Sequence, residues 1–218
     1  MLMKNRTTTF RESEMAQAQT ALLVAIVLEV TLNKTLVVGP KYAIALLELL
    51  LVFGIGVTAP LKHSLGARLR RSFSLLLIAL ISLANAASMI LVANNLIHGS
   101  SIAGKQLIFA AFAIFITNII IFSLWYWEID SPGLTGTRKH DTEPKFLFPD
   151  MQYKVKETKG WEPTYFDYLY LSTTNSTAFS PTDTMPLTHG VKALMGIQAF
   201  IALIAVVLVT ARAVNILG

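Results

Sequence analysis

The sequence predicts an all-α integral membrane protein with four transmembrane helices, a re-entrant short helix and loop, and a fifth, C-terminal transmembrane helix. The composition is 54% hydrophobic and only 14% charged, with a mean hydropathy of +0.57. A water-soluble domain with so few charges could not cover its own surface. The apolar residues form runs close to the roughly 20 residues with which a helix crosses the hydrocarbon core. These runs are residues 17–32, 42–60, 72–97, 107–127 and 191–217.

The first two runs each contain one acidic residue, Glu29 and Glu48. An ionised carboxylate inside a membrane costs several kcal/mol, so such a residue is protonated, paired or exposed to water, and it is a candidate functional group. We expect these two carboxyl groups to face one another, and Glu48 is the candidate for handling a proton or an ion. An alternative is open for Glu29, which lies near the end of its run and close to Lys34. Its side chain could extend to the membrane surface.

The third and fourth runs are joined by the turn-rich segment "HGSSIAGK" and are therefore predicted to form a helical hairpin. The fourth run ends in Trp125, Tyr126 and Trp127, which are typical of an interfacial aromatic belt. A polar segment follows and separates this hairpin from the last run. The predicted organisation is a four-helix membrane region (1–127), a polar loop insertion (128–163), and a re-entrant helix and loop with the last transmembrane helix (164–218).

The predicted re-entrant segment begins with "TYFDYLYLST", residues 164–173, which is long enough for a short helix that follows Pro163 and is capped by Thr164. This helix is too short to cross the bilayer. The next residues, 174–188, are predicted to be irregular, because Ser, Thr and Asn bond their own backbone and prolines remove hydrogen-bond donors. A short helix, an irregular polar stretch and a long helix are typical of a re-entrant loop, which is tolerated at membrane depth only where protein or water buries it.

This C-terminal quarter resembles the pore helix, filter and inner helix of the tetrameric cation channels of the potassium-channel superfamily. The residues that carry the resemblance are the pair Thr173 and Thr174 at the end of an aromatic helix, Pro181, and "VLVTARAVN" at 207–215. The region also resembles uncharacterised bacterial small membrane proteins that have a polar stretch before their last helix. The channel resemblance implies a homo-oligomer, a tetramer in that superfamily. It also implies that Thr173 and Thr174 match the Thr-Thr pair that ends the pore helix, and that the pore-lining or filter-like residues are Thr173, Thr174, Asn175, Ser176 and Thr177.

The filter position lacks the glycines of the potassium-channel sequence Thr-Val-Gly-Tyr-Gly, which allow successive carbonyl groups to point at the ion. This chain has the sequence "NSTAF" there, from Asn175 to Phe179. A potassium-selective ladder of carbonyls is therefore not expected. We expect instead a wider mouth lined by the side chains of residues 174–177, with Asp183 as its acidic residue. Such a mouth would give weak preference for monovalent cations.

Other functional classes receive little support from the sequence. The chain has no cysteine, and its four histidines lack the spacing of metal ligands, so we expect no disulfide, metal site or cofactor. No catalytic motif is present, so we expect no enzyme. The net charge of +5 comes from cations at the ends of helices, which indicates membrane topology rather than nucleic-acid binding.

The sequence therefore predicts a channel-like, multimeric pore protein with weak or no cation selectivity, surrounded by membrane lipid in the cell inner membrane of a bacterium. The alternative is a non-conducting scaffold or accessory subunit of a larger membrane complex.

Basic residues in a short loop predict the orientation of the chain. Lys62, Arg68, Arg70 and Arg71 lie between the second and third runs without an acidic residue, which places this loop in the cytoplasm. Because two spanning runs follow, residues 128–164 return to the same side.

Single cysteines test this orientation without background, because the chain has none. We expect Ser64→Cys and Thr137→Cys to be protected from an impermeant thiol reagent added to intact cells, and to react once the membrane is opened. Reaction of Thr137→Cys alone in intact cells would show that one of the two helices between these positions does not span the membrane.

Overall fold

The computed structural model describes residues 2–32, 34–37, 41–58, 64–98, 102, 104–130, 143–152, 161–180 and 183–217. These residues are mostly helical, as predicted. The long helices are α1 (Leu2–Thr31), α2 (Lys41–Thr58), α3 (Ser64–His98), α4 (Gly104–Asp130) and α7 (His189–Leu217). The short elements are η1 (Lys34–Leu36), β1 (Phe146–Leu147), α5 (Pro149–Gln152), α6 (Tyr165–Thr177) and β2 (Met185–Pro186).

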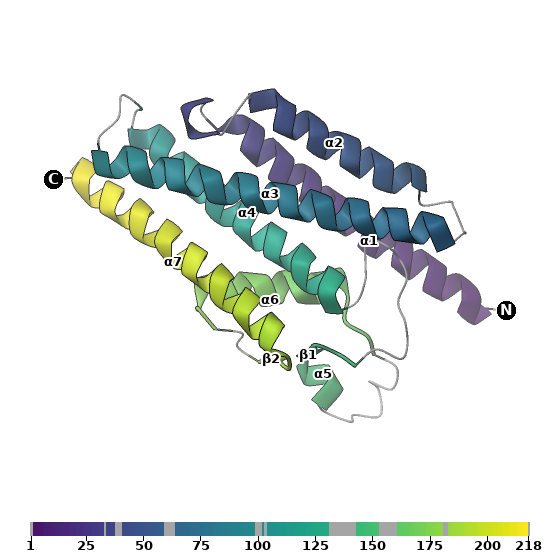
Figure 1. Ribbon diagram of the computed structural model, residues 1–218. Coiled ribbons are helices and arrows are strands. Elements are labelled where there is room, and N and C mark those ends of the chain that lie inside the picture. The colour runs from purple at the N-terminus through teal and green to yellow at the C-terminus, as the bar shows by residue number, and fades with distance from the viewer. Residues whose placement is uncertain are drawn as a thin grey trace.

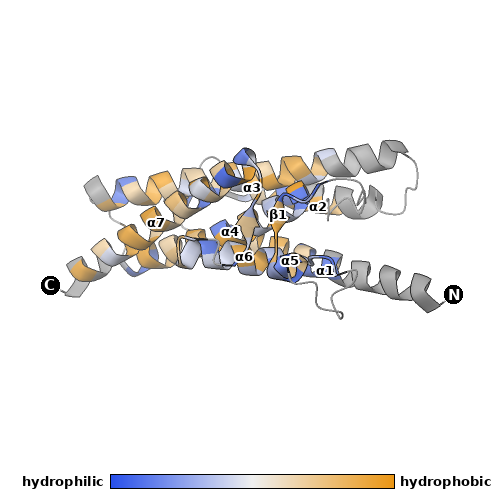
Figure 2. Cartoon of the chain, turned by 90° about the horizontal axis from the view of Figure 1, so that it is seen from below, coloured by the Kyte–Doolittle hydropathy of each residue, from blue (hydrophilic) through white to orange (hydrophobic). Residues whose placement is uncertain are grey.

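Among the described residues, three helical segments are long and apolar enough to cross a membrane: Ser72–Leu96, Gly104–Asp130 and His189–Ala211. Helix α1 contributes a shorter apolar stretch, Ala16–Thr31. Figure 2 shows apolar residues along much of α3 and α7. The chain is thus a membrane-embedded helical protein, and the count of five spans remains a prediction.

Helix α4 forms the centre of the bundle and packs against α1, α3, α6 and α7. Within its apolar stretch 72% of the residues are buried, against 22% in α7, so α4 is the helix that the others enclose. Helix α2 packs on the outside, against α3 and α1. Figure 1 shows these helices running side by side, with α6 beside α4 and the beginning of α7.

Helix α6 runs back along α4 from the end of that helix. The hydroxyl groups of Tyr165 and Ser123 are hydrogen-bonded at 2.9 Å, and further along α6 the Ser172 hydroxyl donates to the carbonyl of Ile119 at 2.7 Å. The chain then returns, because β2 pairs antiparallel with β1, which follows α4 in the sequence. Both ends of the segment that contains α6 therefore lie near the C-terminal end of α4.

The helix predicted for residues 164–173 begins as expected, with Thr164 as its N-cap, but it continues to Thr177. The prediction that residues 174–177 are irregular is therefore wrong. The hydroxyl groups of Thr173, Thr174 and Thr177 donate to carbonyl oxygens three or four residues earlier, so they bond the backbone without interrupting the helix. Beyond the helix, Phe179 adopts a φ of 53°, the left-handed conformation that glycine usually supplies at helix ends.

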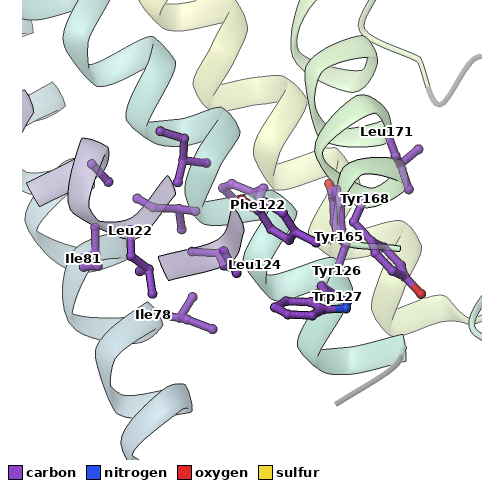
Figure 3. Packing of buried hydrophobic residues seen from close by; sticks show 14 of the residues in the cluster. Leu22, Ile78, Ile81, Phe122, Leu124, Tyr126, Trp127, Tyr165, Tyr168 and Leu171 are labelled. Carbon is purple, nitrogen blue, oxygen red and sulfur yellow. The ribbon is translucent and has the colours of Figure 1, made fainter. Parts of the chain in front are cut away.

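Aromatic residues form the core where α6 meets α4. Tyr126 and Trp127 are almost completely buried, with Tyr165 and Tyr168 of α6 packed beside them (Figure 3). The predicted interfacial belt is therefore wrong for these two residues, because α6 and β1 cover this end of α4. Trp125 is only partly buried, and its indole Nε1 donates to the Ser82 hydroxyl at 3.0 Å.

The segment predicted as a polar loop insertion also contributes to this core. Phe146 and Phe148 are buried, and the Phe146 ring lies 5.2 Å from the ring of Tyr126, measured between centroids, in an edge-to-face arrangement. The backbone nitrogen of Lys145 donates to the carboxylate of Asp130 at the end of α4. The described part of the segment is thus packed against the bundle rather than solvated all round.

We expect Phe146→Ala to lower the free energy of unfolding by about 3–5 kcal/mol, because it removes a buried ring from a packed aromatic core. Met185→Ala is the control, since Met185 lies in the partner strand, where it pairs with Leu147, but is 55% exposed. Denaturant unfolding in detergent micelles, followed by tryptophan fluorescence, measures both. Equal losses would contradict the assignment of the aromatic core.

Candidate functional site

Two groups of polar side chains lie inside the helix bundle. The first, which we call the α6 network, joins α4, α6 and α7 and consists of Tyr126, Ser172, Asn175, Ser176 and Gln198. The second, which we call the carboxyl cluster, joins α1, α2, α3 and α4 and consists of Glu29, Glu48, Asn85, Ser88 and Thr117. All members of both groups are buried.

Gln198 of α7 is the centre of the α6 network. Its carbonyl oxygen accepts hydrogen bonds from the hydroxyl of Tyr126 and from the amide nitrogen of Asn175, the latter at 2.8 Å. Its amide nitrogen lies 2.6 Å from the hydroxyl of Ser172 and 2.8 Å from that of Ser176, both of which can accept. The Gln198 side chain is therefore fully bonded, and it fixes α6 between α4 and α7.

The residues predicted to line a pore mouth do not share one surface of this chain. Asn175 and Ser176 are turned into the α6 network and are 3% and 0% exposed. Thr173 and Thr174 are partly buried, while Thr177 and Asp183 are exposed. The structure thus separates the residues that the sequence predicted to act together.

The carboxyl groups of Glu29 and Glu48 lie within hydrogen-bonding reach of each other. Their side chains are 8% and 0% exposed. The prediction that they face one another is confirmed. The alternative that Glu29 extends toward the surface near Lys34 is wrong, because its side chain is turned inward.

Three of the four carboxyl oxygens of this pair receive no hydrogen bond from the described residues. Among the described residues, no group donates a hydrogen bond to either oxygen of Glu48 or to Oε1 of Glu29. Two ionised carboxylates can only accept hydrogen bonds, so they cannot bond to each other. When they are buried within hydrogen-bonding reach of one another, their negative charges repel. A proton on one of them removes the repulsion and supplies the missing donor. The arrangement therefore favours a pair that holds at least one proton.

Polar side chains from two further helices adjoin Glu29. Asn85 and Ser88 are three residues apart on α3 and so lie on the same face, and Thr117 comes from α4. With Glu29 they line a space of about 10 Å³, which is near the minimum that one water molecule occupies. The rest of the lining is apolar and comprises Leu28, Leu32, Ala113 and Ile114.

Several of these residues were not singled out from the sequence, although one signal was visible. Gln198, Asn85 and Thr117 are each polar residues inside a long apolar run, which is costly unless a partner is found. Their partners lie on other helices, so the sequence did not show which of them meet. Among the described residues, no three His, Asp or Glu side chains gather in a way that could hold a metal ion.

Comparison with known protein families, with curated proteins and with solved structures finds no match to this chain. The resemblance of its C-terminal quarter to channel pore regions therefore stays a prediction. The two buried polar groups are the structural basis on which a function can be argued.

We expect Gln198→Leu to lower the free energy of unfolding by at least about 1–3 kcal/mol, because buried groups of Tyr126 and Asn175 lose their partner. Thr210→Val is the control on the same helix. Thr210 is exposed, and its hydroxyl donates only to the backbone of its own helix, so little change is expected. Thermal unfolding in detergent measures the difference, and similar losses for both variants would show that the network adds no stability.

Proposed function

We propose that this protein handles an ion inside the membrane and that its site is the pair of carboxyl groups of Glu29 and Glu48, which takes up and releases a proton or a monovalent cation. The observation that carries this proposal is the contact between the two buried carboxyl groups, three of whose oxygens receive no hydrogen bond from the described protein. Such oxygens are ready to accept a proton or to coordinate a cation.

Energetics favours a functional role for the pair over a purely structural one. Burying a carboxylate without a partner costs several kcal/mol, and a packed apolar side chain in its place usually stabilises the fold. Among the described ionisable groups, the one that interacts with each of these carboxyl groups is the other carboxyl group. Neither is neutralised by a described cationic side chain. Asn85, Ser88 and Thr117 offer further oxygen atoms beside Glu29. A site that exchanges its ion accounts for a carboxyl pair whose burial is otherwise costly.

The channel-like pore expected around residues 174–177 receives weaker support. Asn175 and Ser176 use their polar groups within their own chain, so they do not offer them to a water-filled axis. We propose instead that α6 is a re-entrant helix that plugs the bundle, since its segment enters and leaves at the same end of α4.

A second candidate function comes from a different class, a non-conducting scaffold or accessory subunit of a larger membrane complex. The observation that favours it is the outer face of α7, where the apolar side chains of Ile197, Phe200, Leu203 and Val207 are exposed along one side of the helix. Within a membrane such a face is covered by lipid, by a second copy in a homo-oligomer, or by another helical protein.

The proposal predicts that dicyclohexylcarbodiimide, a membrane-soluble reagent for protonated carboxyl groups, modifies Glu29 or Glu48. We expect modification near neutral pH that declines as the pH is raised, because the shared proton is then lost. Mass spectrometry of peptides locates the adduct. The exposed Glu162 is the internal control and should show no comparable adduct, because it lies outside the buried carboxyl cluster.

The variant Glu48→Gln keeps the shape of the side chain and removes the ionisable group. We expect it to move the pH range over which labelling at Glu29 declines, because Glu29 no longer shares a proton with a second carboxyl group. We also expect it to reduce proton or cation flux into liposomes, read with an enclosed dye. Absence of labelling at both glutamates over the whole pH range would reject the proposal in favour of the scaffold function. Unchanged flux with lowered stability would make Glu48 a structural polar contact.

A further inference from the structure

A second and larger pocket, of about 440 Å³, lies between α1 and α4 at the end of the bundle where α1 ends and α4 begins. It is lined by Thr31, Leu32, Lys34, Lys105, Gln106, Phe109 and Ala110. The smaller space beside Glu29 lies one turn deeper between the same two helices. Figure 1 shows α1 and α4 as neighbours in the bundle, which agrees with their direct packing.

The two spaces are successive parts of one groove. On α4 the lining residues Gln106, Ala110, Ala113 and Thr117 recur every three or four positions, so they lie along one side of the helix. On α1 the lining passes from Thr31 in the outer pocket to Leu28 and Glu29 in the inner space. The residue common to both linings is Leu32, which is 4% exposed.

We infer that the outer pocket is the aqueous entrance to the carboxyl pair, that the side chain of Leu32 is the barrier between them, and that the ion exchanged there is a proton. This inference rests on the proposed function, because an entrance has a role only if the pair exchanges an ion. It goes further by assigning a route, a barrier residue and an ion.

The charge of the entrance favours a proton over a metal cation. Lys34 and Lys105 line the outer pocket, and no acidic residue is part of its described lining. A cleft lined by charges of one sign concentrates ions of the opposite sign and disfavours ions of the same sign. Sodium and potassium ions are therefore depleted at this mouth. Hydronium ions are depleted by the same field, but a carboxylate can also take its proton from a neutral water molecule, and the hydroxide ion that this leaves is attracted by the two lysines.

The size of the inner space supports the same choice. A monovalent metal ion gives up its hydration shell only when several protein oxygens replace it. The space beside Glu29 has room for about one water molecule, which is enough to relay a proton. Leu32 packs with Ala110, Ala113 and Ile114 of α4 in the apolar cluster at this end of the bundle. A change of its side-chain rotamer opens the barrier without movement of either helix.

The first test compares two carbodiimides on the complete protein in liposomes at one pH. The membrane-soluble reagent reports whether Glu29 is protonated, and a charged, water-soluble reagent reports whether it is reached from water. We expect Leu32→Ala to increase the rate of labelling of Glu29 by the water-soluble reagent several-fold and to change the other rate much less. Leu77→Ala is the matched control, because Leu77 is equally buried but lines neither space.

The outcomes of this test separate the inference from the proposed function. Suppose that the membrane-soluble reagent labels Glu29, but the water-soluble reagent labels it at the same rate in Leu32→Ala and Leu77→Ala. The entrance is then refuted, whereas the proposed ion site is not. If neither reagent labels Glu29 or Glu48, both the entrance and the proposed ion site are refuted. If sodium or potassium ions protect Glu29 from labelling at constant pH and ionic strength, the ion is a metal cation and the assignment of a proton is overturned.

A second test changes no residue of the buried core, so it can be carried out even if Leu32→Ala does not fold. Thr31→Cys lies in the outer pocket, and Val27→Cys lies on the exposed outer face of α1 as its control. We expect a negatively charged thiol reagent to modify Thr31→Cys several-fold faster than a positively charged one, with the preference lost when Lys34→Gln and Lys105→Gln are added. No reaction at Thr31→Cys from either side of the membrane, or reaction equal to that of Val27→Cys, would refute an aqueous entrance.

Discussion

A helix that is buried over most of its surface within a membrane protein can satisfy few of its polar side chains with water or lipid headgroups, and α4, with 72% of its apolar stretch buried, is such a helix. It is packed against α1, α3, α6 and α7. Every polar group on it must therefore find a partner on one of these neighbours or remain unbonded. The positions of the surrounding helices follow from where those partners lie.

The two polar groups around α4 meet this constraint in opposite ways. In the α6 network each described side chain has a partner, and Gln198 bonds residues from two other helices. Such a satisfied network gives rigidity and a single arrangement. In the carboxyl cluster the oxygens of Glu48 receive no hydrogen bond from the described residues, so the same constraint leaves buried acceptors unbonded, and the ion exchange that we propose depends on them. The first group is suited to hold the fold, and the second is the site of the ion exchange that we propose.

The absence of glycine between Phe166 and Thr188 has a structural explanation in this setting. A segment of small polar residues allows α6 to pack closely against α4 and α7 while its hydroxyl and amide groups bond across the contact. Ser172 does so with the carbonyl of Ile119, and Asn175 with the carbonyl of Met195 at 3.0 Å. The helix then ends without glycine, and Phe179 takes the left-handed conformation at some cost in strain.

The sequence alone determined that the protein is helical and membrane-embedded, because long apolar runs with so few charges have no other stable solution. It also determined which acidic residues are candidates, since Glu29 and Glu48 interrupt those runs, and it located the start of α6 at Thr164 through local capping chemistry. These properties depend on residues that are close together in the chain.

Only the tertiary structure decided which polar residues meet. Nothing in the apolar run around Gln198 indicates that its partners are on α4 and α6. The sequence around Tyr126 and Trp127 likewise does not indicate whether these side chains face lipid or are buried beneath α6. For the same reason the sequence did not show that, of the residues predicted to line a pore, Asn175 and Ser176 are buried within the bundle. The identities of Asn175 and Ser176 show which hydrogen bonds these side chains can make. Packing between helices that are distant in the sequence decides which partners they use, because burial removes water as the alternative partner.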